Sequence, residues 1–290
     1  MTVMDVARRT LRRSIAYKVA RSTQLQMRGL QDPARPLPSF VIIGAHKAGT
    51  TSFYKNLTTH PQILPAWTKE VHYFDQDPLP PLSWYRAHFP TRRELSEIEG
   101  ISGEASPSYC LLPHVPQLLR QQMPDCRLIL LLRDPVARAY SAHQYNSRGG
   151  MTDLSFEAWI ERDFRLVGDA DITADRYASL LSKSNPAEKL PLALLRGIYV
   201  EQIKLWHAAF PADQLLILDS AEYFGDAPGT LRDVARDFLG LRDHDFGYRK
   251  TRTEARSYPK IPGETADRLR AFYAPYNARL SDYLGRDFDW

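Results

Sequence analysis

Short apolar runs alternate with amphipathic stretches along most of the chain. Four runs are expected to form buried strands: Phe40–Gly44, Ile101–Glu104, Arg127–Leu132 and Gln214–Asp219. Helical patterns occur at Thr50–Thr59, 139–146 and Tyr199–Phe210. Because apolar strands that alternate with helices are typical of parallel sheets, the pattern predicts an α/β fold, a single domain with a central parallel β-sheet flanked by helices.

Two segments depart from this pattern. Residues 1–38 predict a basic N-terminal helical arm and a Pro-rich linker, and residues 39–290 then form the folded domain. The arm has an apolar stripe surrounded by arginines, formed by Met4, Leu11, Ile15 and Val19. Such a helix either lies on an anionic membrane surface or a partner, or packs on its own domain. Residues 165–196 are polar and weakly patterned, which indicates a long excursion over the surface.

Positive charge is concentrated in the arm. The chain has a net charge of +4, and residues 1–38 hold eight Lys/Arg against two Asp/Glu, so the remainder carries about −2 (4 − 6). A folded domain without excess positive charge argues against nucleic-acid binding. Cys110 and Cys126 form no CxxC pair, and no apolar stretch approaches the roughly 18 residues of a membrane span. We therefore expect a cytoplasmic protein, peripheral at the inner membrane surface if the arm binds lipid.

The first predicted strand leads into a candidate anion-binding loop, "GAHKAGTTS". Gly44 and Gly49 have the spacing of a phosphate-binding loop, but Thr50 stands where an ATPase has its lysine, and Lys47 comes earlier. A loop between a strand and a helix N-terminus offers unpaired backbone N–H groups and a favourable dipole to an anion. The candidate contacts are the Lys47 ammonium, the backbone of Ala48 and Gly49, and the hydroxyls of Thr50, Thr51 and Ser52.

A second candidate anion site follows the strand Arg127–Leu132. Arg133 stands at its end, and Ser141 lies eight residues later on the predicted helix. An arginine can bind a phosphate with paired hydrogen bonds, although a salt bridge between Arg133 and Asp134 is an equally good interpretation of these residues alone. Two anion sites together suggest a nucleotide with phosphate on both sides of its ribose. A P-loop kinase is disfavoured because it would need a lysine at position 50.

These motifs resemble those of the sulfotransferases that use 3′-phosphoadenosine 5′-phosphosulfate (PAPS), most closely the heparan sulfate N- and 3-O-sulfotransferase branch. The 5′-phosphosulfate loop matches "GAHKAGTTS", and the 3′-phosphate motif matches "LLLRDPVARAYSAHQYN". Agreement continues through "KEVHYFD", "SWYRAHFP", "GEASPSY", "WHAAFP" and "GRDFDW", so it covers nearly all of Phe40–Trp290. The resemblance implies a P-loop (nucleotide-kinase-like) sulfotransferase fold, PAPS as co-substrate, PAP as product and no metal.

The resemblance also implies roles for residues of "TKEVHYFD". Glu70 would be the general base that takes the acceptor proton, and Lys47 would stabilise the charge on the leaving oxygen. His72 is the rival base, because other sulfotransferase branches use histidine; in an extended segment it would point to the same side as Glu70. Near the end, Arg256 in "EARSYP" resembles part of the loop that closes on the nucleotide, which makes it a candidate second phosphate ligand.

The acceptor is the least determined partner. Several heparan sulfate enzymes carry a lysine directly after the glutamate of "GEASPSY", where this chain has Ala105, which argues against heparan sulfate itself. The resemblance favours a carbohydrate or glycoconjugate hydroxyl over a small phenolic or lipid hydroxyl. The alternative of a different class is a non-catalytic nucleotide-binding module. Nothing in the sequence predicts the oligomeric state.

Overall fold

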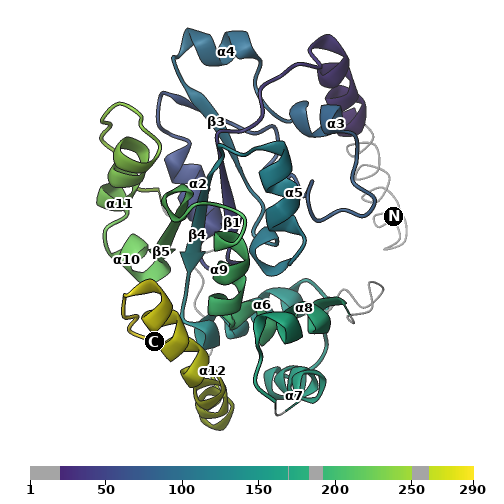
Figure 1. Ribbon diagram of the computed structural model, residues 1–290, viewed down its shortest axis with the longest axis vertical. Coiled ribbons are helices and arrows are strands. Elements are labelled where there is room, and N and C mark those ends of the chain that lie inside the picture. The colour runs from purple at the N-terminus through teal and green to yellow at the C-terminus, as the bar shows by residue number, and fades with distance from the viewer. Residues whose placement is uncertain (1–19, 169, 183–191, 250–260) are drawn as a thin grey trace, which may run out of the picture.

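The computed structural model describes residues 20–168, 170–182, 192–249 and 261–290 (Figure 1). Its centre is a five-stranded sheet, all parallel, in the order β2-β3-β1-β4-β5. The strands are β1 (Phe40–Gly44), β2 (Ile63–Pro65), β3 (Ile101–Ala105), β4 (Arg127–Leu132) and β5 (Leu215–Asp219). The predicted α/β fold with a central parallel sheet is confirmed, and only the three-residue β2 was missed among these strands.

Helices connect successive strands, as parallel pairing requires. The predicted helices correspond to α2 (Thr50–Leu57), α6 (Pro135–Arg148) and α9 (Tyr199–His207). The other α-helices are α3 (Leu82–Arg86), α4 (Arg92–Glu97), α5 (Val115–Gln122), α7 (Phe156–Val167), α8 (Ala174–Ser182), α10 (Ser220–Gly225), α11 (Ala227–Asp233) and α12 (Gly263–Leu284). Short 3₁₀ turns are η1 (Tyr109–Leu111), η2 (Leu195–Gly197) and η3 (Ala212–Gln214), and η4 (Val234–Phe238) is a π-helical turn.

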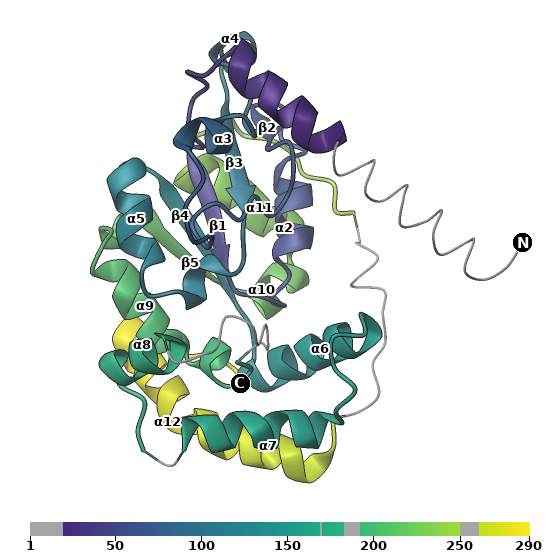
Figure 2. The same ribbon diagram turned by 90° about the vertical axis from the view of Figure 1, so that its right-hand side faces the viewer.

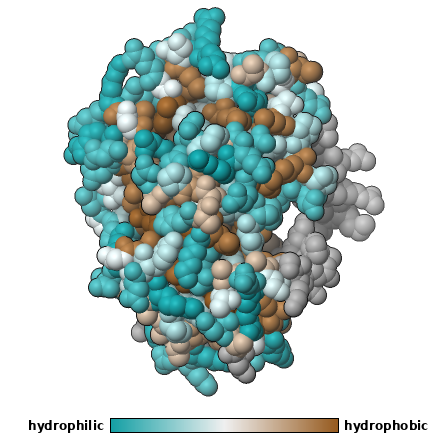
Figure 3. Space-filling view, viewed as in Figure 1, coloured by the Kyte–Doolittle hydropathy of each residue, from teal (hydrophilic) through white to brown (hydrophobic). Residues whose placement is uncertain are grey.

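The helices form layers around the sheet (Figure 2). Helices α2, α10 and α11 lie on one side of it and α5 and α9 on the other, while α6, α7, α8 and α12 gather beyond the ends of the strands. Coverage on both faces explains why Val41, Ile42 and Leu130 have no exposed surface. Hydrophilic residues cover most of the face seen in Figure 3, with hydrophobic residues showing between them. The carboxyl ends of β1 and β4 therefore meet a helical layer, which is where parallel α/β sheets bind ligands.

The predicted surface excursion over residues 165–196 is wrong for its described part. Residues 174–182 form helix α8, and Ile172 and Tyr177 have no exposed surface. Leu194 and Leu195 at the end of the segment are also fully buried. The prolines and the many polar residues of the segment hid two local signals: the consecutive apolar residues 192–195, and Tyr177, Leu180 and Leu181 at helical spacing.

The described part of the N-terminal arm packs on the domain. Residues 20–31 are helical, and Leu25 is 7% exposed. Arg28 donates hydrogen bonds from Nε to the Ala87 carbonyl (2.9 Å) and from Nη2 to the Phe89 carbonyl (3.0 Å), and its guanidinium lies 4.7 Å from the centre of the Trp67 ring. This is the second of the two alternatives for the arm, whose apolar stripe (Met4, Leu11, Ile15 and Val19) lies outside the described residues. Within the described ranges, no helix is long and apolar enough to cross a membrane.

Candidate active site

The loop between β1 and α2 has the backbone of an anion cradle. Lys47 and Gly49 have positive φ angles of 72° and 93°, and Gly49 caps α2 with no side-chain hydrogen bond. A side chain at position 49 would meet Phe224 Cζ at 2.8 Å, so glycine is needed for conformation and for space. The loop thus turns its backbone at the start of α2, where amide groups have no partner within the helix.

The loop is supported from behind by α10. The Ser220 hydroxyl donates to the Ala48 carbonyl (2.9 Å), and Ser52 Oγ lies 3.1 Å from the Tyr223 hydroxyl. Thr50 is 4% exposed and Ser52 2%, and Thr51 is half-buried. Of the three predicted hydroxyl donors, Ser52 is therefore already hydrogen-bonded inside the protein. The contacts from α10 were not predicted, since they join residues about 170 positions apart in the chain.

The two predicted anion sites touch each other. Arg133, directly after β4, donates from Nη1 to the Lys47 carbonyl at 3.0 Å, and the Tyr199 hydroxyl donates to the Arg133 carbonyl at 2.8 Å. The Asp134 carboxylate caps α6 by accepting from the amides of Val136 and Ala137. Ser141 lies on α6 and is 4% exposed. Arg133 is thus fixed against the first loop, with Ser141 on the helix that starts beside it.

An aromatic side chain of α6 covers the loop lysine. Lys47 Nζ lies 4.3 Å from the centre of the Tyr145 ring, which is 49% exposed and packs edge-on to His46. Burial lowers the pKa of His46 well below its usual value, and the charges of Arg196 and Lys47 lower it further. The His46 ring is therefore neutral near pH 7. Neither Tyr145 nor His46 was a predicted site residue, although both stand inside the two quoted motifs.

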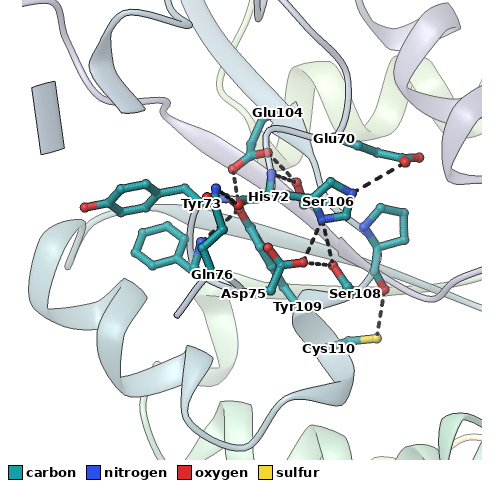
Figure 4. Close-up of polar contacts among 12 residues, drawn as sticks. Glu70, His72, Tyr73, Asp75, Gln76, Glu104, Ser106, Ser108, Tyr109 and Cys110 are labelled. Carbon is teal, nitrogen blue, oxygen red and sulfur yellow. Dashed lines mark hydrogen bonds and ion pairs between the residues drawn. The ribbon is translucent and has the colours of Figure 1, made fainter. Parts of the chain in front are cut away.

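A chain of charged groups lies in the segment between β2 and α3 (Figure 4). His72 Nδ1 is 2.6 Å from Asp75 Oδ2, and His72 Nε2 is 3.7 Å from Glu70 Oε2. On its other oxygen, Glu70 pairs with Lys69 Nζ at 2.5 Å. Ser108 donates to Asp75 Oδ2 at 2.5 Å. Glu70 and His72 are therefore neighbours, as predicted, but Asp75 and Ser108 complete the group and were not predicted.

The contacts set the charges of this group. The hydrogen bond that His72 donates to Asp75, followed by the one that it donates to Glu70, raises the pKa of His72 to about 10. The hydrogen bond from His72 and the charge of Lys69 lower the pKa of Glu70 to about 2. At neutral pH the pair is consequently a carboxylate beside an imidazolium, and both ring nitrogens of His72 carry protons.

Glu70 and His72 were expected to point to the same side of an extended segment, and this expectation is wrong. The segment is not extended: the two residues have φ angles of 64° and 54°, in the left-handed region that residues other than glycine rarely adopt. The side chains meet because the backbone turns at both positions. A strand would have brought them together by alternation instead.

Comparison with known proteins decides the family. The model of the sulfotransferase domain family matches residues 37–255. This chain belongs to the sulfotransferase domain family. It is 30% identical to heparan sulfate glucosamine 3-O-sulfotransferase 3A1 of Mus musculus over 285 residues, 90% of this chain and 66% of that protein. It is also 25% identical to the membrane-associated sulfotransferase kil1 of Dictyostelium discoideum, covering 88% of this chain and 66% of that protein.

A solved structure gives the same result for the fold. The crystal structure of a sulfotransferase from Alicyclobacillus acidocaldarius superposes with a TM-score of 0.64 and 25% identity, covering 87% of this chain and 98% of that one. The resemblance to the sulfotransferases and the predicted fold class are thereby confirmed. The chain spans 66% of the length of the first two relatives named here, so their activities are not transferred to it outright.

Two further positions of this sulfotransferase bear on the predictions. Ala105, where several heparan sulfate enzymes have a lysine, is fully buried, and its carbonyl accepts from the Glu70 amide at 3.0 Å. Arg256, the candidate second phosphate ligand, lies outside the described residues. Among the described residues, no group of three or more His, Cys, Asp or Glu side chains is placed to hold a metal ion.

Proposed function

We propose that this sulfotransferase moves a sulfuryl group from PAPS to a hydroxyl of a carbohydrate or glycoconjugate acceptor, with Glu70 as the general base. The observation that carries the proposal is the hydrogen bond from Arg133 to the Lys47 carbonyl. It joins the two candidate anion sites into one, and a nucleotide with phosphate groups on both sides of its ribose is the ligand that suits such a pair.

The residues present suit this co-substrate. The turn at Lys47–Gly49 and the first residues of α2 offer backbone amides and an ammonium group to the 5′-phosphosulfate. Arg133 and Ser141 would hold the 3′-phosphate, since a guanidinium and a hydroxyl are both donors to phosphate oxygens. Lys47 would stabilise the leaving 5′-phosphate, which gains negative charge as its bond to sulfur breaks.

The transfer step needs one proton acceptor. The acceptor oxygen forms a bond to sulfur, the electrons of the broken S–O bond remain on the 5′-phosphate, and the hydroxyl proton leaves to a base. Glu70 suits this role because its carboxylate is ionised at neutral pH and 45% exposed. A carboxylate of low pKa suffices, because the hydroxyl becomes strongly acidic once its oxygen bonds to sulfur.

His72 suits a supporting role better than that of the base. Its Nδ1 faces Asp75 and its Nε2 faces Glu70, so the protonated ring has no lone pair for the acceptor proton. As an imidazolium it holds the Glu70 carboxylate in place and keeps it ionised.

The carbohydrate acceptor is supported by the first relative named above, a heparan sulfate glucosamine 3-O-sulfotransferase. Buried Ala105 in place of a lysine favours an acceptor other than heparan sulfate. Aromatic side chains of the motifs around Glu70 are candidates to contact a sugar, but Tyr73, Phe74, Tyr85 and Tyr109 belong to the core. Trp67, which is 37% exposed and has the Arg28 guanidinium 4.7 Å from its ring centre, and the partly buried Trp84 are the remaining candidates for contact with a sugar.

Labelled transfer tests the proposal. Protein incubated with ³⁵S-PAPS should label members of a carbohydrate and glycoconjugate panel and should leave phenols and sterols unlabelled. Calorimetry should show PAP binding that EDTA does not change and no binding of ATP with Mg²⁺. If only phenols were labelled, the acceptor would be a phenol and not a carbohydrate. ATP binding without PAP binding would contradict the proposed function.

A further inference from the structure

The backbone of residues 70–74 is held by a single neighbouring segment, residues 104–109. Four amides of the first segment, those of residues 70, 72, 73 and 74, donate to acceptors of the second. Glu70 N donates to the Ala105 carbonyl (3.0 Å). The next three donors and acceptors are His72 N to Ser106 Oγ (3.1 Å), Tyr73 N to the Tyr109 hydroxyl (2.8 Å) and Phe74 N to the same hydroxyl (3.3 Å).

The carboxylate of Glu104 accepts hydrogen bonds from Ser106 and Tyr109 of this segment (Figure 4). The Glu104 side chain has no exposed surface, and burial raises its pKa above the usual value. Oε2 accepts from Ser106 (2.7 Å), and Oε1 accepts from the hydroxyls of Tyr85 (2.8 Å) and Tyr109 (3.3 Å). Each of these partners is a neutral donor. A carboxylate buried against neutral donors is costly, so a positive reason for its presence is expected.

The hydroxyls of Ser106 and Tyr109 connect Glu104 to the segment that carries Glu70. Each hydroxyl donates its hydrogen to Glu104 and accepts from one or two amides of residues 72–74. A carboxylate fixes the direction of both hydroxyl hydrogens, which leaves their lone pairs facing the amides. The same segment reaches the side chains, because Ser108 donates to Asp75, the partner of His72.

This fixation answers a conformational need. Glu70 and His72 both have positive φ angles, which cost free energy in residues other than glycine unless the surroundings hold them. Ser106 itself is tied to the centre of the sheet, because its amide donates to the Ile42 carbonyl of β1 at 3.1 Å. The strained turn is thus anchored to the strand that precedes the anion-binding loop.

We propose that Glu104 is a positioning residue for sulfuryl transfer, which orients Ser106 and Tyr109 so that they fix the backbone of residues 70–74 and hence the Glu70–His72–Asp75 group. The inference rests on the proposed function, since the group it positions contains the proposed base. Glu104 is buried and does not touch the acceptor. Its effect passes through the amide contacts.

Two tyrosines provide a matched pair of variants. Both rings are fully buried, and both hydroxyls donate to Glu104 Oε1. Only the Tyr109 hydroxyl also accepts from the amides of Tyr73 and Phe74. Tyr109→Phe and Tyr85→Phe therefore each remove one donor to Glu104, but only Tyr109→Phe also removes the acceptor for the amides of residues 73 and 74.

The readout is the titration of His72, followed by NMR on protein labelled at histidine and assigned with His72→Asn. Its pKa of about 10 depends on the placement of Asp75 and Glu70, with Ser108 and Lys69 beside them. Tyr109→Phe, Ser106→Ala and Glu104→Gln should each lower this pKa by about one unit or more, and Tyr85→Phe should leave it in place. In Tyr109→Phe, Ser106→Ala and Glu104→Gln, kcat should also fall by about tenfold or more, while the PAP dissociation constant changes less than about twofold.

Equal behaviour of the two tyrosine variants in the His72 titration would overturn the proposal, because the network would then be an ordinary part of the core. An unchanged His72 titration in Glu104→Gln would also overturn it. The two proposals fail separately, since the NMR readout needs no activity. A His72 pKa that responds as expected in a protein that sulfates no acceptor would refute the proposed function and leave the fixation of the segment standing.

Discussion

Replacing Glu70 by glutamine tests the proposed base most directly. The side chain keeps its size and can still accept a hydrogen bond from Lys69, which lies 2.5 Å away, but it cannot take a proton. Because the pKa of Glu70 is about 2, the wild-type carboxylate is ionised at every pH above about 4, and the whole population can act as base. Losing a positioned base lowers the rate about 10²–10⁴-fold, or roughly 3–5 kcal/mol of barrier.

The assay is single-turnover transfer at saturating PAPS between about pH 5 and 9, with PAP affinity measured in parallel. Wild-type protein should show no loss of rate toward pH 5, and Glu70→Gln should be slow throughout with PAP affinity unchanged. The charge control is Glu97→Gln, which breaks an exposed ion pair with Arg93 and should keep full activity. His72→Asn should retain more activity than Glu70→Gln. Near-native turnover in Glu70→Gln together with an inactive His72→Asn would refute the reasoning and make His72 the base.

Three further outcomes are expected. Arg133→Ala should weaken PAP binding by about 1.5–3 kcal/mol and adenosine 5′-phosphosulfate binding far less, and equal losses in calorimetry would exclude Arg133 as the 3′-phosphate contact. Asp75→Asn should lower the pKa of His72 from about 10. The variant should therefore be less stable to unfolding than the wild type, with the largest difference between pH 3.8 and 6.5 and a smaller one as the pH rises through about 10. Thermal melts of both proteins across pH measure this difference. Deleting residues 1–29 should leave sulfation of a soluble acceptor intact but lower the melting temperature, because Arg28 and its two carbonyl contacts are lost; an unchanged melting temperature would show that these contacts add no stability.

The features that sequence predicts well are those that local chemistry determines. The side chains of Phe40–Gly44 are apolar on both faces of the strand, so they need covering layers on both sides, and the run is the central strand of the sheet. The loop that follows it carries its own signal, because glycine at position 49 and the lysine at 47 sit at the start of a helix. The apolar run that forms β4 likewise ends at Leu132 in both sequence and structure, which places Arg133 directly after the strand.

The features that sequence does not predict depend on contacts across the fold. Asp75 stands in the same quoted motif as Glu70, three residues after His72, and that spacing was the available signal for it. The turn that brings Glu70 and His72 together has no local signal, because neither is glycine and the hydrogen-bond partners of its amides lie about 35 positions further along the chain. Helix α8 was missed for a different reason: Tyr177, Leu180 and Leu181 do recur at helical spacing, but the polar residues and prolines around them obscured that signal.

Fixing residues 70–74 through their amides leaves two side chains exchangeable. The hydrogen bonds engage backbone N–H groups, which every residue except proline possesses, while the side chains of Val71, Tyr73 and Phe74 are buried in the core. The side chains at positions 70 and 72 are left as the exposed ones, so a library can vary these two positions while the polypeptide keeps its path. A sulfotransferase built in this way lends itself to redesign, because histidine, aspartate or cysteine can be tried as the base on an unchanged scaffold.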